Sequence, residues 1–208
     1  MSSKWSASIA LVLVCAFGGL AVTTTASAHI PIPPKKGEIG RKAVDIPVPD
    51  FTLVDQNGKP FRFAGARGKL IVATFIFTTC PDVCPLLSAK FAAIQRALDD
   101  KRQRDTLLLS ITTDPEIDTS AVLKSYAERY KADAGRWLFL TGSRERLAKV
   151  WSDFGVNVKK FGPGQVQHTA LTTLIDRGGR RRFDYYTDKW QEKSVLRDLE
   201  SLAGRGHD

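Results

Sequence analysis

A run of apolar and β-branched residues, LIVATFIF from Leu70 to Phe77, leads directly into TTCPDVCP and then into a helical pattern. A run without polar alternation is typical of a central strand that is buried on both faces. The apolar residues that follow recur on one helical face: Cys84, Leu87, Phe91, Ile94 and Leu98. A strand that feeds directly into a helix is the basic unit of an α/β fold, so this segment constrains the architecture strongly.

The same alternation continues along the chain. Further strands are predicted at 106–112, 136–142, 168–176 and 180–186, and further helices at 120–131, 143–154 and 189–202. Ser143 is the expected N-cap of one helix and Gly155 lies just past its end. An earlier segment, PDFTLVDQNGKPFRF, predicts a hairpin that turns at Asn57-Gly58. These elements predict an α/β fold with a central mixed sheet flanked by helices, an N-terminal hairpin and a late antiparallel hairpin.

Length and composition suit one soluble domain, because 208 residues with 43% hydrophobic content can bury a proper core. The first 28 residues differ: Lys4 is followed by an apolar stretch from Ile9 to Val22 and by small residues ending at Ala28. This order is typical of a cleaved export signal, and the alternative is an uncleaved signal that anchors the protein in a membrane. The predicted divisions are a signal (1–28), a linker or arm (29–45), a folded domain (46–203) and a tail (204–208).

The formal charge is +9 at pH 7, and nucleic acid is the usual partner of a basic protein. Here the positive side chains are scattered, and export to the periplasm takes the protein away from nucleic acid. The densest group, Arg180–Arg182, follows a Gly-Gly turn. We interpret the charge as a solvated surface, with an acidic partner protein or an anionic membrane surface as the functional option, and expect no nucleic acid binding.

Cysteine is scarce. Cys15 lies in the predicted signal, so the mature chain keeps only Cys80 and Cys84. In an oxidising compartment, two thiols four residues apart can form a disulfide, a redox couple or part of a metal site, and the plain alternative is two ordinary buried thiols. They follow the predicted central strand at its carboxyl end, where ligands gather in such sheets. The positive end of the following helix is expected to lower the pKa of both thiols.

A third ligand would separate metal binding from disulfide exchange. His168 opens a predicted strand after the loop KKFGPGQVQ, which can bring its imidazole over the end of the sheet; the alternative is a solvated loop histidine. Two thiolates and one imidazole favour Cu(I) and accept Cu(II), whereas a structural zinc normally has a fourth protein ligand. His207 lies at the end of the chain, and His29 would chelate Cu(II) only as a new N-terminus.

Four segments resemble, in order, the Sco/SenC proteins, which are thioredoxin-fold copper chaperones of cytochrome c oxidase assembly. The segments are TFIFTTCPDVCP, TTDPEIDTSAVLKSYAERY, LTGSRERLAKVW and QHTALTTLID. The similarity extends from about Pro49 to Leu202. It implies a thioredoxin-like fold, bound Cu(I) or Cu(II), and Cys80, Cys84 and His168 as copper ligands. It also implies copper transfer to subunit 2 of cytochrome c oxidase or to another copper protein.

The resemblance further implies a reductase role, with Cys80 and Cys84 as a catalytic redox pair. We therefore expect a metallochaperone rather than an enzyme; the alternatives are a thiol-disulfide oxidoreductase without a metal role, and a copper or redox sensor.

Many relatives have Asp directly before the histidine, whereas this chain has Gln167, so orientation of the imidazole by a carboxylate is lost there. Asp82, between the thiols, and Asp114, after a strand, are secondary candidates for the site.

Overall fold

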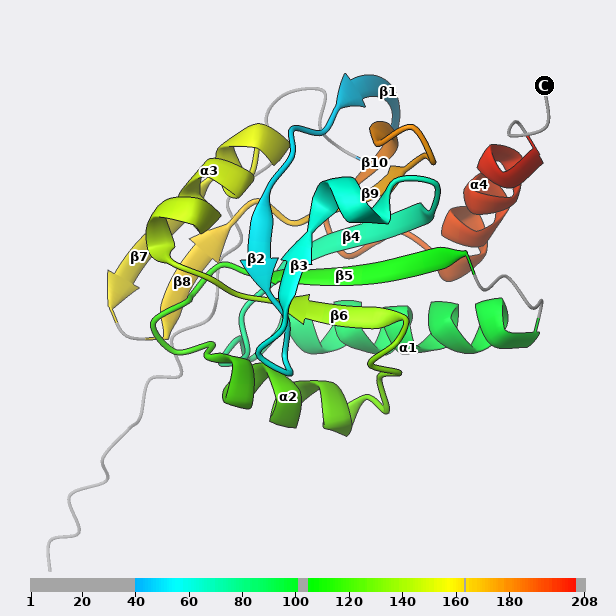
Figure 1. Ribbon diagram of the computed structural model, residues 1–208. Helices are drawn as coiled ribbons and strands as arrows, with labels where there is room; N and C mark the ends of the chain where they lie inside the picture. Colours follow the sequence, from blue (N-terminus) through cyan, green and yellow to red (C-terminus); the bar gives the residue numbers. More distant parts are fainter. Residues whose placement is uncertain (1–39, 101–104, 163, 205–208) are drawn as a thin grey trace, which may run out of the picture.

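The computed structural model describes residues 40–100, 105–162 and 164–204 (Figure 1). A six-stranded sheet has the order β1-β10-β9-β4-β5-β6. Strands β4, β5 and β6 are parallel, whereas β9, β10 and β1 join the sheet in antiparallel pairs. Their bounds are β1 Arg41–Pro47, β4 Leu70–Ile76, β5 Thr106–Thr112, β6 Trp137–Leu140, β9 Leu171–Ile175 and β10 Arg180–Tyr186. The predicted mixed sheet is confirmed, and β9 and β10 form the late hairpin.

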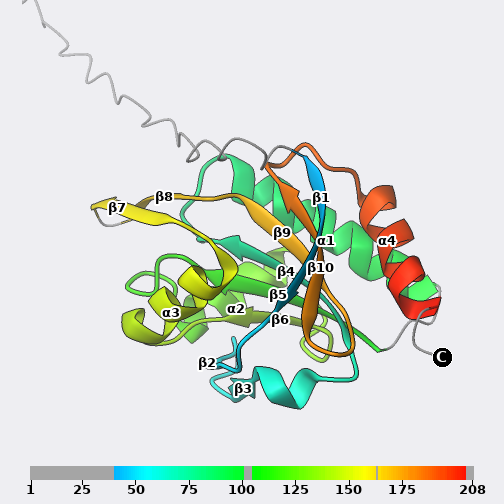
Figure 2. The same cartoon turned by 90° about the horizontal axis from the view of Figure 1, so that it is seen from above.

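Helices cover both faces of the sheet, as Figures 1 and 2 show. Side chains of α1, α2 and α4 pack in one core cluster, and those of α3 and the short 3₁₀ helix η1 pack in the other. The bounds are α1 Val83–Asp100, α2 Ser120–Arg129, α3 Arg144–Phe154, α4 Glu192–Gly204 and η1 Phe63–Ala66. The flanking helices expected from the alternating sequence pattern are therefore present on both sides.

The sequence of strand β4 lacks polar alternation because both faces of the strand are buried. Every residue of β4 is buried. Val72 and Ile76 belong to the core cluster with α1 and α4, whereas Ile71 and Phe75 belong to the cluster with α3. Full burial of one such side chain contributes about 1.5–3 kcal/mol, so the central strand stabilises both layers at once.

Local signals set the ends of α3. The Ser143 side chain accepts a hydrogen bond from Arg146 N, and Gly155 ends the helix in the left-handed conformation with φ of 73°. Glycine adopts this conformation without the steric penalty of a Cβ atom. The predicted cap residues are both confirmed.

The N-terminal hairpin consists of β2 (Thr52–Val54) and β3 (Pro60–Arg62). Asp55 Oδ1 accepts hydrogen bonds from the backbone N–H groups of Asn57 and Lys59, each at 2.8 Å. Gly58 has φ of 76°, as a turn at Asn57-Gly58 requires. The predicted hairpin is confirmed.

Two segments differ from the prediction. Strand β1 begins at Arg41, so Arg41–Ala43 pairs with β10 instead of belonging to an arm that ends at residue 45. The segment expected as a loop before His168 forms a second hairpin, β7 (Val158–Gly162) and β8 (Gln165–His168), and His168 ends β8 instead of opening β9. Both segments are short or mostly exposed, so their sequences carry little hydrophobic periodicity.

The predicted signal, most of the predicted arm, and residues 205–208 lie outside the described residues. Within the part of the chain that is described, no helix has both the length and the hydropathy needed to cross a bilayer.

Candidate metal centre

The two cysteines lie in the turn that joins β4 to α1 and in the first turn of that helix. Phe77 O accepts a hydrogen bond from Cys80 N at 3.3 Å, and Cys84 N donates to Cys80 Sγ at 3.5 Å. Both thiols are reduced and buried, with exposed fractions of 5% for Cys80 and 1% for Cys84. The turn therefore presents a pair of adjacent sulfur atoms at the carboxyl end of the central strand, as the four-residue spacing predicts.

The pKa of the Cys84 thiol is raised well above the ordinary cysteine value. Burial is the largest cause, because it removes water from the thiolate, and the hydrogen bond and charge of Cys80 act in the same direction. The prediction of a lowered pKa is wrong for Cys84: desolvation can shift a buried group by several pKa units, which exceeds the effect of a helix terminus. Cys84 is therefore a neutral thiol at neutral pH until a metal or a base takes its proton.

His168 lies beside this turn. Its ring packs edge-on against the Phe77 ring, with 5.9 Å between the ring centroids, and the residue is only 3% exposed. The alternative of a solvated loop histidine is therefore wrong. Because Phe77 is three residues before Cys80, this aromatic contact brings the imidazole to the end of β4 where the thiols lie.

A backbone group orients the imidazole. His168 Nδ1 lies 3.0 Å from the carbonyl oxygen of Thr169. A carbonyl can only accept, so this hydrogen bond places a proton on Nδ1, and in the neutral ring Nε2 is then the nitrogen that can bind a metal. Gln167 supplies no carboxylate, and here the Thr169 carbonyl orients the ring.

The three predicted ligands do not form a ready-made metal site. Within residues 40–100, 105–162 and 164–204, no three His, Cys, Asp or Glu side chains are gathered closely enough to hold an ion. The thiol pair and the imidazole are neighbours through Phe77, and a three-ligand site requires them to approach one another. The ligand set of Cys80, Cys84 and His168 therefore stays a prediction.

Asp118 is the residue near the thiols that the sequence did not reveal. Its buried carboxylate accepts hydrogen bonds from Thr78 N, at 3.2 Å to each oxygen, and from the hydroxyl groups of Thr78 and Thr112. Burial raises the pKa of Asp118, and the hydrogen bonds from the two threonines oppose that shift. Asp118 therefore fixes the backbone two residues before Cys80. The only signal in the sequence is a second Asp in the segment TTDPEIDT, directly before the N-cap of a helix.

The secondary candidates have different surroundings. Asp114 is fully buried, and its Oδ1 accepts from Lys160 Nζ at 2.8 Å, so its charge is matched by a lysine of β7. Its Oδ2 has no hydrogen-bond partner among the described residues. Asp82 is exposed directly before α1. His29 and His207 lie outside the described residues.

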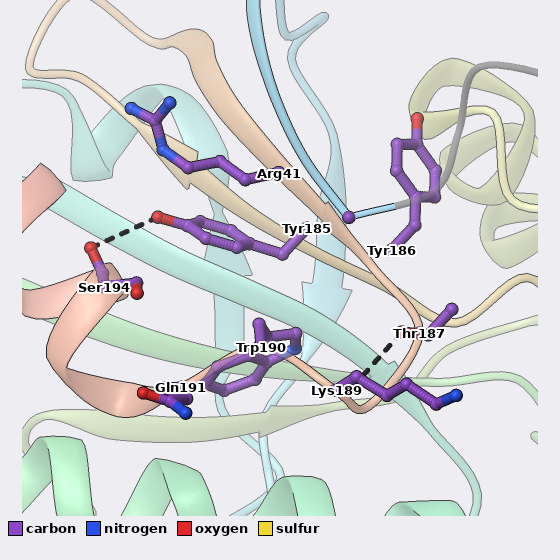
Figure 3. Close-up of a pocket in the computed structure, with 9 residues that line it drawn as sticks. Arg41, Tyr185, Tyr186, Thr187, Lys189, Trp190, Gln191 and Ser194 are labelled. Atoms are coloured by element: carbon purple, nitrogen blue, oxygen red, sulfur yellow. Dashed lines mark hydrogen bonds between the residues drawn. The ribbon is translucent and has the colours of Figure 1, made fainter.

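A separate concavity of about 270 Å³ lies between the start of β1, the end of β10 and the start of α4 (Figure 3). Tyr185 and Trp190 form its aromatic wall, with 6.1 Å between their ring centroids. Neither the two thiols nor His168 lines it. This concavity therefore plays no part in the candidate metal centre.

The fold and the site together define a thioredoxin-like α/β protein whose central strand ends in a buried pair of thiols beside an oriented imidazole. Residues 41–204 match the family model described as SCO1/SenC, and the chain belongs to the SCO1/SenC family. The resemblance seen in the sequence motifs is thereby confirmed over nearly the whole described domain.

Three solved structures are similar over most of the chain. A SCO1/SenC family lipoprotein from Bacillus anthracis is 32% identical with a TM-score of 0.72, covering 78% of this chain and 98% of that one. ScoI from Bradyrhizobium japonicum, solved with copper bound, is 30% identical with a TM-score of 0.66, covering 76% and 99%. BsSco, a Sco family cytochrome c oxidase assembly protein in which a disulfide switch was identified, is 28% identical with a TM-score of 0.69, covering 79% and 97%.

Proposed function

We propose that this protein binds copper through Cys80, Cys84 and His168 and delivers it to the dinuclear copper site on subunit 2 of cytochrome c oxidase. The observation that carries the proposal is a reduced thiol pair next to a buried imidazole whose Nδ1 is hydrogen-bonded to a backbone carbonyl. Two thiolates and one imidazole suit Cu(I) and accept Cu(II). The copper bound by ScoI and the assembly role of BsSco support the same function here.

Such a protein carries copper as its cargo. The ion would bind the two thiols first. Cys80 and Cys84 are already adjacent, whereas His168 packs against Phe77. We infer that the sulfur pair binds first and that His168 then closes on the ion. A site with only three protein ligands keeps a coordination position open, through which an acceptor can take the metal.

The export signal expected at residues 1–28 supports delivery in the periplasm, with attachment to the membrane if that signal is not cleaved. The scattered positive charge of the chain suits an acidic acceptor protein or an anionic membrane surface.

X-ray absorption on the copper-loaded protein tests the ligand set. We expect one copper per chain, with sulfur and nitrogen scatterers in a ratio of about two to one. Cys80→Ser, Cys84→Ser and His168→Ala should each weaken copper binding by at least about 10–100-fold, the loss that follows even from changing an outer-shell partner. Gln165→Ala, at an exposed position of β8, is the matched control. Unchanged affinity and scattering in the His168 variant would remove the histidine from the site.

A second candidate function is thiol-disulfide exchange, favoured by the adjacency of the two buried thiols, where Cys84 N donates to Cys80 Sγ at 3.5 Å. In this reaction the reduced pair would give two electrons and two protons to a partner disulfide and become a disulfide itself. An insulin reduction assay separates the two functions. Activity that is lost in both cysteine variants but persists with a copper chelator and in His168→Ala would support exchange; no activity in the wild-type protein would exclude it.

A further inference from the structure

The loop between β5 and α2 contacts both halves of the candidate metal centre. On one side, Asp118 holds the backbone N–H and the hydroxyl of Thr78, two residues before Cys80. On the other side, Asp114 and Glu116 form ion pairs with Lys160 of β7. One short segment, residues 114–118, is therefore in contact with the thiol turn and with the hairpin that carries His168.

Lys160 connects this loop to the hairpin. Its Nζ lies 2.8 Å from Asp114 Oδ1 and also pairs with Glu116, which in turn binds Arg144 Nε at 2.6 Å. Asp114 is fully buried and the Lys160 side chain is 24% exposed, so the pair is shielded from much of the solvent. We call Lys160, Asp114, Glu116 and Arg144 the ion-pair cluster.

The pairing of β7 with β8 links the position of Lys160 to the position of the imidazole. Lys160 is paired with Val166 and Val158 is paired with His168 across the β7–β8 ladder. A side chain that fixes β7 therefore also restricts where β8 and His168 lie. Besides the contact of the His168 ring with Phe77, the hairpin contacts the thiol turn through a neutral hydrogen bond, from Thr79 Oγ1 to Gly164 O at 3.3 Å, at an exposed position. The charge-assisted contact of Lys160 with the Asp114 carboxylate is a stronger hydrogen bond than this neutral one.

We propose that Lys160 is a positioning residue for the copper site: its ion pairs with Asp114 and Glu116 set the place of His168 relative to Cys80 and Cys84. This inference rests on the proposed function. The apparent affinity of a site falls in proportion to the fraction of molecules in the competent arrangement. Loss of Lys160 therefore weakens the nitrogen ligand, whereas the thiol pair, held through Asp118, is kept.

The test compares Lys160→Met with Lys159→Met, which removes the same charge from an exposed neighbouring position of β7. Lys160→Arg serves as the conservative rescue. We measure Cu(II) affinity, nitrogen hyperfine coupling by electron paramagnetic resonance, and amide hydrogen exchange of the copper-free proteins. Lys160→Met should lose roughly tenfold in Cu(II) affinity, a loss typical of outer-shell changes, with weaker nitrogen coupling and retained thiolate-to-copper absorption. Exchange at Val166, Gln167 and His168 should be faster in this variant alone.

Three results would overturn the proposal. They are unchanged copper binding in Lys160→Met, an equal change in Lys159→Met, and faster exchange in the hairpin without any effect on the nitrogen coupling. Failure of the proposed function has a different signature, because the wild-type protein would then bind no copper. The exchange rates of the copper-free variants would still decide whether Lys160 fixes the hairpin.

Discussion

At the scale of single residues, burial controls the ionisation of the groups beside the thiol turn. The pKa values of Cys84 and Asp118 are both raised, in each case chiefly by desolvation. The negative charge of Asp118 also contributes to the raised pKa of Cys84. A buried thiol next to a carboxylate keeps its proton, so metal-free Cys84 stays neutral until a cation displaces the proton.

This protonation state predicts proton release on copper binding. At about pH 7, Cys84 enters the reaction as a neutral thiol and must become a thiolate to bind copper, which releases about one proton per ion from this residue. Titration of the reduced protein with Cu(I) in weakly buffered solution measures the release per bound copper. Cys84→Ser should release about one proton fewer than the wild-type protein. Equal release from the two proteins would contradict a protonated Cys84.

The site was predictable from the sequence only where residue types are scarce. Only two of the three cysteines lie outside the predicted signal, and histidines are few. Cys80, Cys84 and His168 were therefore identifiable as candidates, because such side chains have few structural uses in pairs. Asp118 was not identifiable, because a carboxylate directly before a helix N-cap has the same sequence signature whether it faces solvent or a buried backbone amide. Its role depends on the approach of Thr78, which lies in the turn after β4, forty residues earlier in the chain.

At the scale of elements, the helices and strands that are most buried are the ones that the sequence predicts best. Strands β4 and β5 are buried at every residue and were predicted almost to the residue. Strand β1 and the β7–β8 hairpin were missed, since their exposed positions are free to be charged and so carry no period of two. The ion-pair cluster contacts the hairpin through Lys160, and charge partners that are distant in sequence leave no local signal.

The ion-pair cluster predicts a pH-dependent contribution to stability. Hydrogen bonds from Arg144 and Lys160 lower the pKa of Glu116 to about 2. A lowered pKa means that the stabilisation is fully present above the ordinary glutamate pKa and is lost as pH falls through about 2. Because the Glu116 side chain is nearly half exposed, we expect Glu116→Gln to cost no more than about 1 kcal/mol at neutral pH.

Urea unfolding of the wild-type protein and of Glu116→Gln, between about pH 2 and about pH 6, measures this contribution. The difference in unfolding free energy should shrink from below about pH 4.5 and approach zero near about pH 2. Glu128→Gln, at an exposed position of α2, is the control. A difference that stays constant over the whole range would show that Glu116 does not act through its charge.

At the scale of the whole molecule, the first strand and the last helix are joined by one buried carboxylate. Asp198 of α4 accepts from Arg41 Nε at 2.5 Å and Arg41 Nη2 at 3.0 Å, and the Tyr185 hydroxyl also donates to it. Figure 3 shows Arg41 and Tyr185 on neighbouring strands, with Ser194 of α4 beside the tyrosine hydroxyl. The edge strand β1, which buries little apolar surface, is therefore tied to the C-terminal helix mainly by polar contacts.

This tie predicts that Arg41→Met destabilises the protein although Arg41 is substantially exposed. Methionine keeps some packing on the Phe183 ring, over which the guanidinium lies at 4.3 Å, but leaves the Asp198 carboxylate buried without a cation. Such a loss costs about 1–3 kcal/mol of unfolding free energy. Lys42→Met, at the next exposed position of β1, should cost less than about 0.5 kcal/mol.

The double variant Arg41→Met with Asp198→Leu shows whether the cost comes from the unpaired carboxylate. Removing both charges leaves no buried ion, and the Tyr185 hydroxyl keeps the carbonyl of Ser194 as an acceptor at 3.3 Å. The double variant should therefore be more stable than Arg41→Met alone, and its loss should fall short of the sum of the two single losses by a coupling of about 0.5–3 kcal/mol. If urea unfolding gave a loss for the double variant equal to the sum of the two single losses, Arg41 and Asp198 would stabilise the protein independently. Strand β1 would then be held by its hydrogen bonds with β10 and not by α4.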